Sequence, residues 1–208
     1  GPIRKARFVT WDMSKRQHRI LDAQAFLMHA TNWSETSIIA QVFSRDYGIV
    51  TVIAKGAKRP YSVLRPILSA FQPLLLSWSG QGEIKTLTRA EIAGLLPLGG
   101  RSLMSGWYMN ELLLKLLPKE DPHQVLFDAY ADALAQLADG SPATGALRRF
   151  EWTLLNETGY AIEGEVPDFD DRSAEPALRL ALRERINEHL ENRSLLTRKV
   201  LHSLRHFS

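Results

Sequence analysis

The sequence predicts an α+β protein in which a small five-stranded barrel is followed by an all-helical domain. Between Gln24 and Ala90, β-branched and aromatic residues occur in short runs separated by turn-forming residues, which is typical of strands. After Gly99 and Gly100, apolar residues recur every three or four positions, which is typical of helices. With 208 residues and 45% hydrophobic content, the chain can bury a core in one large domain or two small ones.

Strands are expected at residues 24–29, 37–44, 49–55, 72–78 and 85–91. Gly48 and the Gly80 to Gly82 stretch supply glycines for two hairpin turns. Residues 56–70 contain Pro60 and Pro66 and are therefore expected to form a long connection rather than a central strand. Five strands with two hairpins and one long connection predict an OB-type barrel, whose face commonly binds oligonucleotides, with an SH3-like barrel as the close alternative.

The second half is expected to contain five helices. The first runs from about Leu103 to Leu117, the second from Asp121 as N-cap with Pro122 at the first helical position to Gly140, and the third from Ser141 and Pro142 to Gly159. Two further helices are expected at residues 175–190 and 194–206. The acidic residues 163–171 are expected to form a loop.

Several enzyme and cofactor classes are excluded by the sequence. The chain has no cysteine, which excludes disulfides, thiolate zinc sites and cysteine nucleophiles. The glycines near residues 56 and 80 lack the pattern of a phosphate-binding loop. His202 with His206, and Asp168 with Asp170 and Asp171, lack further ligands at metal-site spacing, so surface histidines and a solvated loop are favoured. We therefore expect no catalytic residues, no cofactor and no metal.

Positive charge is concentrated in the first half of the chain. Residues 1–100 contain 13 Lys and Arg against 6 Asp and Glu, whereas residues 101–208 contain 13 against 17. No acidic residue occurs between Tyr47 and Gly82. Clustered positive charge gains affinity for nucleic acid by releasing condensed counterions, although chance surface charge is an alternative explanation.

The cationic residues in and after this stretch are the candidates for nucleic-acid binding: Lys55, Lys58, Arg59, Arg65, Lys85 and Arg89. Lys85 and Arg89 lie four positions apart, and this even spacing predicts that they share one face of the last strand. Trp78 and Phe71 flank apolar strand residues and are expected in the core, whereas Tyr61 lies in the basic connection and is a candidate for stacking on a base.

A second candidate site lies in the third helix, where Leu147, Arg148 and Arg149 place two guanidinium groups beside an apolar helix face. Such a face fits an acidic, hydrophobic peptide whose carboxylates an arginine can clamp. From the residues alone, the favoured interpretation is that these are two ordinary surface arginines, one of them paired with Glu151 or Glu111.

An ordered series of short segments resembles the bacterial RecO family. These segments are HATNWSETS (29–37), VIAKGAK (52–58), FQPLLL (71–76), GEIKTL (82–87), YMNELL (108–113), LFDAY (126–130), LRRFE (147–151) and GY (159–160). The resemblance spans residues 24–160, and SLLTRKVL at 194–201 resembles the last helical segment of the family more loosely.

The resemblance implies a recombination mediator in DNA repair that is not an enzyme. It implies binding to single- and double-stranded DNA, annealing of complementary strands, binding to the acidic tail of single-strand DNA-binding protein, and cooperation with RecR to load RecA. By position, Lys55, Lys58, Arg59, Lys85 and Arg89 resemble the DNA-binding set, and Arg148 resembles part of the tail pocket. Some family members carry a four-cysteine zinc module, which this cysteine-free chain lacks.

Three parts of the chain are expected from these patterns. Residues 1–20 form a basic extension with Gly1 and Pro2 as a protease-cleavage scar, residues 21–98 form the OB-type DNA-binding domain, and residues 99–208 form a helical protein-interaction domain. Without a secretion signal or an apolar run of roughly 20 residues, we expect a cytoplasmic protein and no membrane partner. The resemblance implies association with the bacterial nucleoid. The alternatives are a general OB-type module that binds RNA and an enzyme with an accessory barrel.

The comparison with the family also marks two unusual regions. Residues 164–177 are short for the family, which puts in doubt a surface built there, including part of the contact with RecR. The basic segment from Arg4 to Arg19 is an unusual extension.

Overall fold

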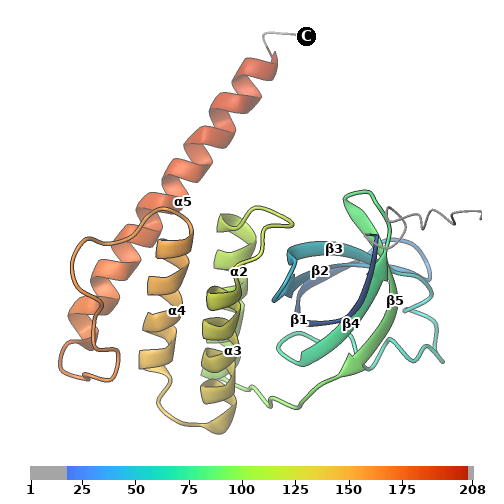
Figure 1. Ribbon diagram of the computed structural model, residues 1–208, viewed down its shortest axis with the longest axis horizontal. Helices are drawn as coiled ribbons and strands as arrows, with labels where there is room; N and C mark the ends of the chain where they lie inside the picture. The colour runs from blue at the N-terminus through green and yellow to red at the C-terminus, as the bar shows by residue number, and fades with distance from the viewer. Residues whose placement is uncertain (1–17, 206–208) are drawn as a thin grey trace, which may run out of the picture.

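A computed structural model describes residues 18–205 of the chain. Within this range, five strands form a closed barrel, and four helices follow it (Figure 1). The strands are β1 (Arg19–Asn32), β2 (Ile38–Ser44), β3 (Gly48–Ala54), β4 (Pro73–Ser79) and β5 (Ile84–Ile92). They are ordered β1-β2-β3-β5-β4 around the barrel, with β3 and β5 parallel and the other pairs antiparallel. This Greek-key order confirms the predicted fold class.

The strand β1 extends beyond the predicted range 24–29 at both ends. Its first part pairs with β4 from Arg19 opposite Ser79, and its second part pairs with β2 up to Asn32 opposite Ile38. Two register irregularities along β1 allow one strand to bend between both partners. Most of the predicted basic extension, residues 1–17, lies outside the described residues.

The barrel core consists of side chains that alternate inward along the strands. Val42, Val50, Val52, Leu74, Leu76 and Trp78 are each at most 2% exposed. Trp78 therefore lies in the barrel core, and its burial confirms the prediction. Phe71 is also buried as predicted, but it packs against the helices. Burial of these apolar side chains supplies the main driving force for closing the barrel.

The helices are α2 (Arg101–Leu116), α3 (Gln124–Asp139), α4 (Thr144–Glu157) and α5 (Glu175–Arg205). The second and third helices begin two residues later than predicted, with His123 and Ala143 as N-caps in place of Asp121 and Ser141. Before α3, the Glu120 N–H donates to the carbonyl of Ile49, which holds this segment against β3 ahead of the helix. Before α4, the Ser141 hydroxyl bonds Asp139 instead of capping the helix.

Gly48 allows the segment before α3 to approach β3 closely. Its φ of +72° is in the left-handed region, and a Cβ atom there would lie 2.3 Å from the carbonyl oxygen of Asp121. Any other residue would displace the backbone of this segment. The glycine predicted for the hairpin turn therefore also fixes how the barrel meets the helices.

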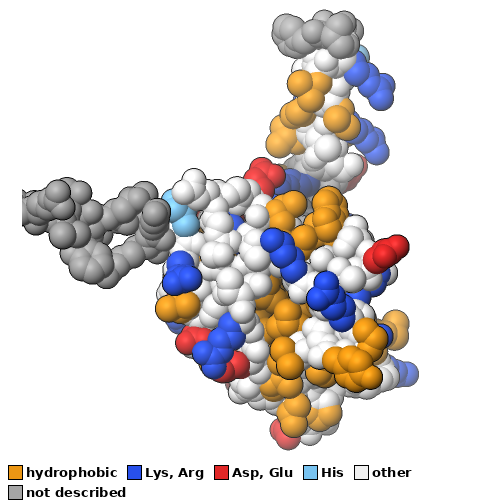
Figure 2. Space-filling view, turned by 90° about the vertical axis from the view of Figure 1, so that its right-hand side faces the viewer, with side chains coloured by type: hydrophobic (Ala, Val, Ile, Leu, Met, Phe, Trp, Pro, Cys, Tyr) orange, Lys and Arg blue, Asp and Glu red, His pale blue; other side chains and the backbone are white. Residues whose placement is uncertain are grey.

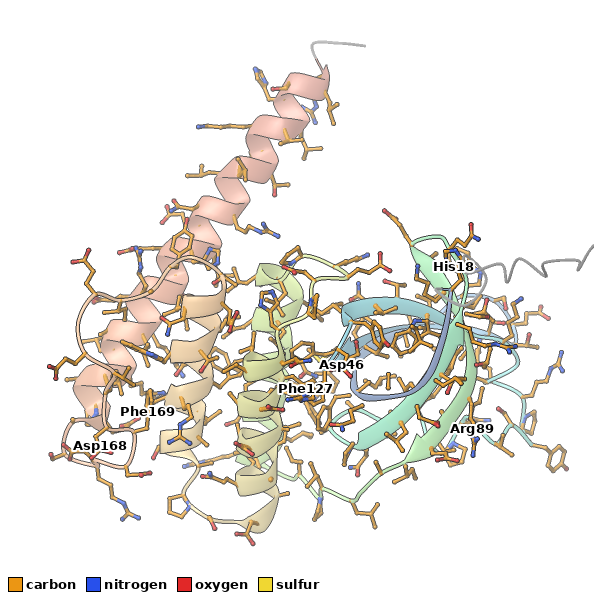
Figure 3. All side chains as sticks on the ribbon, in the orientation of Figure 1. His18, Asp46, Arg89, Phe127, Asp168 and Phe169 are labelled. Carbon is orange, nitrogen blue, oxygen red and sulfur yellow. The ribbon has the colours of Figure 1, made fainter. Side chains whose placement is uncertain are left out.

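An aromatic cluster joins the barrel to the helices. The rings of Phe26 and Phe43 on the barrel contact those of Phe127 and Tyr130 on α3, with centroids 5.1 to 5.9 Å apart. Figure 3 shows Phe127 at this junction, between α3 and the strands. Aromatic pairs in such tilted and edge-to-face arrangements stabilise an interface beyond the area they bury. Phe26 and Phe43 thus belong to the core of the helices, while the barrel keeps a core of its own.

The last helix differs from the prediction, because α5 is one continuous helix of 31 residues where two helices were expected. The expected break near residues 191–193 contains neither proline nor glycine, so nothing forces the backbone out of the helix. Leu182, Ile186 and His189 are buried against the other helices, whereas residues 191–205 are exposed. Figure 1 shows this second part projecting from the rest of the molecule.

The predicted loop between α4 and α5 is confirmed, since residues 163–171 contain neither helix nor strand. No helix within residues 18–205 combines the length and the apolar character required to cross a membrane.

Candidate nucleic-acid and peptide interfaces

The basic connection between β3 and β4 presents several cations to solvent. Lys55, Arg59 and Arg65 are exposed, and Tyr61 is 98% exposed. Backbone hydrogen bonds from Ala57 to Ala54 and from Arg59 to Gly56 fold the start of the connection into consecutive turns. Within residues 18–205, none of these three cations forms an ion pair with a carboxylate, so their charge is available to a ligand.

Lys58 connects this segment to the loop between β1 and β2. Its ammonium group donates to the carbonyl of Ser34 at 3.0 Å, and its backbone N–H donates to the carbonyl of Thr36. The neighbouring Trp33 is 62% exposed because the Ser34 hydroxyl accepts hydrogen bonds from the following backbone and closes a tight turn. We call Trp33, Lys55, Lys58 and Arg59 the outer basic surface.

Sequence reasoning left Trp33 out of the DNA-binding set. The signal was present, since a tryptophan followed by Ser-Glu-Thr-Ser cannot continue an apolar strand. Figure 2 shows the barrel side of the molecule, where Lys and Arg side chains border exposed apolar side chains. An exposed aromatic ring beside cations is the arrangement that binds single strands by stacking and charge.

Lys85 and Arg89 do not share a face of β5, so that prediction was wrong. Ser77 pairs with Arg89 but the next residue, Trp78, pairs with Leu87, which leaves Thr88 as an extra residue in β5. This bulge reverses the alternation, so Leu87 and Ala90 both point into the barrel although they are three residues apart.

The bulge places the two cations in different surroundings. The Lys85 side chain is 13% exposed, and its ammonium group lies 3.1 Å from the Glu120 carboxylate on the side of the barrel that meets the helices. Arg89 is exposed and pairs with Glu91 on its own strand. Figure 3 shows Arg89 on the outside of the barrel. Their participation in DNA binding stays a prediction.

In α4, Arg148 is buried and has internal partners. It is 3% exposed, it forms an ion pair with the fully buried Glu151, and its Nη1 lies 2.9 Å from Glu175 at the start of α5. Tyr108 on α2 donates its hydroxyl proton to Glu151 at 2.7 Å. Burial and the adjacent Glu151 carboxylate raise the pKa of Tyr108, which stays protonated.

The ion pairs of Arg148 limit how this residue could bind the carboxylate of a peptide. The expected pairing of one arginine with Glu151 is present, but Arg148 is a buried residue rather than a surface one. Arg148 can bind a carboxylate of a peptide only after its ion pair with Glu175 breaks. A peptide contact by Arg148 therefore stays a prediction.

Arg149 and Leu147 are more accessible. Leu147 is half-buried against the helical core, and Arg149 is exposed with its guanidinium 5.4 Å above the ring of Phe169. Arg149 also lines a cavity of about 250 Å³ between the start of α4 and the 163–171 loop, together with Gly145, Phe169, Asp170 and Arg172. The lining of this cavity is mainly polar, and the cavity is partly open to solvent.

Sequence comparisons divide the chain as the structure does. Residues 19–96 match the family described as recombination protein O N terminal, and residues 100–166 match recombination protein O C terminal. DNA repair protein RecO of Aromatoleum aromaticum is 53% identical over 165 residues, which cover 79% of this chain and 68% of the relative. This chain belongs to the RecO family.

Other RecO proteins match over a similar range. The RecO of Ralstonia nicotianae is 53% identical over 151 residues, which cover 72% of this chain and 56% of the relative. The RecO of Azoarcus sp. is 53% identical over 148 residues, covering 71% of this chain and 61% of the relative. The chain thus spans between about half and two thirds of the length of these RecO proteins.

The RecO match places both candidate sites within the family's own regions. The outer basic surface lies within residues 19–96, and Leu147 to Arg149 lie within residues 100–166. The loop up to residue 166 is inside the match, whereas Phe169 and all of α5 follow it. Within residues 18–205, no group of three or more metal-ligating side chains is found.

Proposed function

We propose that this chain acts in DNA repair as a non-enzymatic recombination mediator, with residues 21–98 as its DNA-binding domain and residues 99–208 as its protein-interaction domain. Its activities would be binding of single- and double-stranded DNA and annealing of complementary strands. Its partners would be the acidic tail of single-strand DNA-binding protein and RecR, and through them RecA. It would act on the bacterial nucleoid in the cytoplasm.

The outer basic surface carries this proposal. Lys55 and Arg59 have no carboxylate partner within residues 18–205, and Lys58 holds the turn of the exposed Trp33 next to them. Cations bind phosphates without regard to sequence, and an aromatic ring stacks on any base. A surface of this kind suits a protein that must bind whatever sequence lies in a repair gap.

The proposed binding of a partner protein involves α4. The exposed Arg149, the half-buried Leu147 and the buried Arg148 give this helix face an apolar side chain next to positive charge. A weak contact here combined with a weak contact to DNA would give a strong overall attachment, because the second contact becomes intramolecular once the first has formed. This would direct the protein to DNA already covered by single-strand DNA-binding protein.

Fluorescence anisotropy with labelled DNA strands tests the proposed DNA binding. The wild type should bind single- and double-stranded DNA, and Lys55→Ala/Lys58→Ala/Arg59→Ala should lower the affinity about 100-fold and reduce the salt dependence, because about three phosphate contacts are lost. The matched control is Arg179→Ala/Arg198→Ala/Lys199→Ala, which removes the same charge from exposed positions of α5.

Two results would contradict the proposal. Equal losses in both triple variants would mean that net charge, rather than the outer basic surface, controls binding. Clear preference for RNA of the same sequence over DNA would support the general OB-type RNA module instead, for which the names of the relatives give no support.

A further inference from the structure

The loop between α4 and α5 places an aromatic side chain on α4. Phe169 is half-buried, its ring centroid lies 6.4 Å from that of Trp152, and the Arg149 guanidinium lies 5.4 Å from the same ring centroid. Figure 3 shows Phe169 directed towards α4 and Asp168 at the outer edge of the loop. The ring thus occupies the helix face that contains Arg149.

Gly145 at the start of α4 permits this contact. A Cβ atom at position 145 would lie 2.5 Å from the carbonyl oxygen of Phe169, which is closer than such atoms approach. Because the obstructing atom belongs to the backbone, a side chain at this position forces the loop to shift. The absence of a side chain at position 145 therefore lets the loop lie against α4.

Several carboxylates lie close to Phe169 in the sequence. Asp168, Asp170 and Asp171 flank Phe169 in sequence, and slightly further on Glu175 gives its carboxylate to Arg148 at 2.9 Å. The α4 surface thus holds an aromatic ring between Trp152 and Arg149 and a carboxylate on Arg148. An acidic peptide with an apolar or aromatic side chain would present the same groups.

Few contacts hold the loop in this position. The hydrogen bonds of residues 163–173 found within residues 18–205 are all local, such as those that Asp168 and Asp171 accept from the following residues. The contact with α4 therefore depends on the Phe169 ring and on the ion pair of Glu175. Loops of this kind open at low free-energy cost compared with helices of the core.

We propose that residues 167–175 are an internal competitor for the α4 surface, so that this surface binds an acidic peptide with an aromatic side chain only when the loop moves away. In the bound state, the aromatic side chain of the peptide replaces Phe169 between Trp152 and Arg149, and one of its carboxylates replaces Glu175 on Arg148. This inference rests on the peptide binding given under the proposed function, and it adds how that binding is regulated.

The proposal predicts a measurable gain in affinity when the loop is loosened. If the loop covers the surface about 90 to 99% of the time, the apparent affinity for a peptide is reduced about 10- to 100-fold. Phe169→Ala removes the competing ring, and Gly145→Ala obstructs the backbone of the loop. Both variants should therefore bind the peptide at least tenfold more tightly than the wild type.

The probe is a fluorescently labelled synthetic peptide with one phenylalanine among four aspartates, measured by anisotropy. Val166→Ala is the control, since Val166 lies in the same loop and is 71% exposed. It should leave the affinity unchanged. Arg149→Ala in the Phe169→Ala background should abolish the gain, which ties the gain to α4, and circular dichroism should show that each variant is folded.

A second measurement follows the loop itself. Saturating peptide should increase hydrogen exchange of the amides of Asp170, Asp171 and Ser173 in the wild type, because the turns that contain them are less stable once Phe169 no longer holds the loop against α4. This readout does not depend on any substitution. Unchanged exchange in the presence of bound peptide would contradict displacement.

The outcomes separate this inference from the proposed function. If the wild type binds the peptide through Arg149 and neither Phe169→Ala nor Gly145→Ala binds more tightly, the inference fails and peptide binding by α4 stands. If only the two variants bind, the inference is supported in its strongest form. If neither the wild type nor any variant binds, the peptide-binding limb of the proposed function fails and the inference fails with it.

Discussion

The Nη1 atom of Arg148 lies 2.9 Å from the Glu175 carboxylate, and this contact joins α4 to the first turn of α5. The Nε atom of the same guanidinium pairs with Glu151, which is fully buried and also accepts a hydrogen bond from Tyr108. One arginine thus links α2, α4 and α5. Its removal would leave a buried carboxylate without a counterion.

Arg148→Ala should therefore destabilise the protein by about 3 to 5 kcal/mol, because breaking a buried ion pair from one side leaves an uncompensated charge. Urea denaturation measures the change in the free energy of unfolding. Arg149→Ala is the control and should change it by less than about 1 kcal/mol, since this side chain is exposed and loses only its contact with the Phe169 ring. A loss of stability as small as the control's would show that the Arg148 network contributes little.

Asn110 on α2 connects the helices to the barrel. Its amide donates to the carbonyl of Met28 at 3.2 Å and its side-chain oxygen accepts the Tyr130 hydroxyl proton at 2.5 Å. Asn110→Leu should cost about 1 to 3 kcal/mol, because buried polar groups lose their partners. Adding Tyr130→Phe should recover part of this loss in a denaturation experiment. Additive losses in the double variant would contradict the shared hydrogen bond.

We expect His189 to make the stability of the folded protein depend on pH. It is 5% exposed, its ring stacks on Tyr160 at 3.8 Å, and burial together with Arg193 and Arg185 lowers its pKa. The unfolded chain then binds the proton more readily than the folded protein, so stability falls as the pH drops below the ordinary histidine pKa of 6.5. His189→Gln should reduce this dependence between pH 7 and pH 5, as thermal melts would show. An unchanged slope in His189→Gln would assign the pH dependence to other groups.

Trp33 should contribute to binding of single-stranded DNA by stacking. Trp33→Ala should weaken binding by about 1 to 3 kcal/mol, and Trp33→Phe should keep most of the affinity, because any aromatic ring provides a stacking face. Anisotropy with a labelled single strand measures both. Tyr61→Ala is the matched comparison from the basic connection. Equal affinities of the wild type and Trp33→Ala would remove Trp33 from the proposed surface.

The barrel could be predicted because its signals are local. Gly48 and the glycines at 80 and 82 mark hairpins, and the prolines at 60 and 66 mark the long connection between β3 and β4. The bulge at Thr88 could not be predicted in this way, because it depends on how β5 pairs with β4. Spacing alone therefore placed Lys85 and Arg89 on the same face.

The helical half shows the same limit. The apolar spacing predicted the helices, but the backbone contact between Glu120 and Ile49 delays α3, and this contact joins residues distant in sequence. The burial of Arg148 also depends on Glu175, which lies 27 positions further along the chain. Long-range pairing decides which charged residue is buried, and it is not encoded in the spacing within one helix.

We propose that DNA and the acidic peptide bind at separate sites, the outer basic surface and the α4 face. The most direct test of this proposal measures both ligands by anisotropy with Lys55→Ala/Lys58→Ala/Arg59→Ala and with Arg149→Ala. We predict that the triple variant loses DNA binding and keeps peptide binding, and that Arg149→Ala does the reverse. Loss of both ligands in either folded variant, or full DNA binding by the triple variant, would contradict the two-site account.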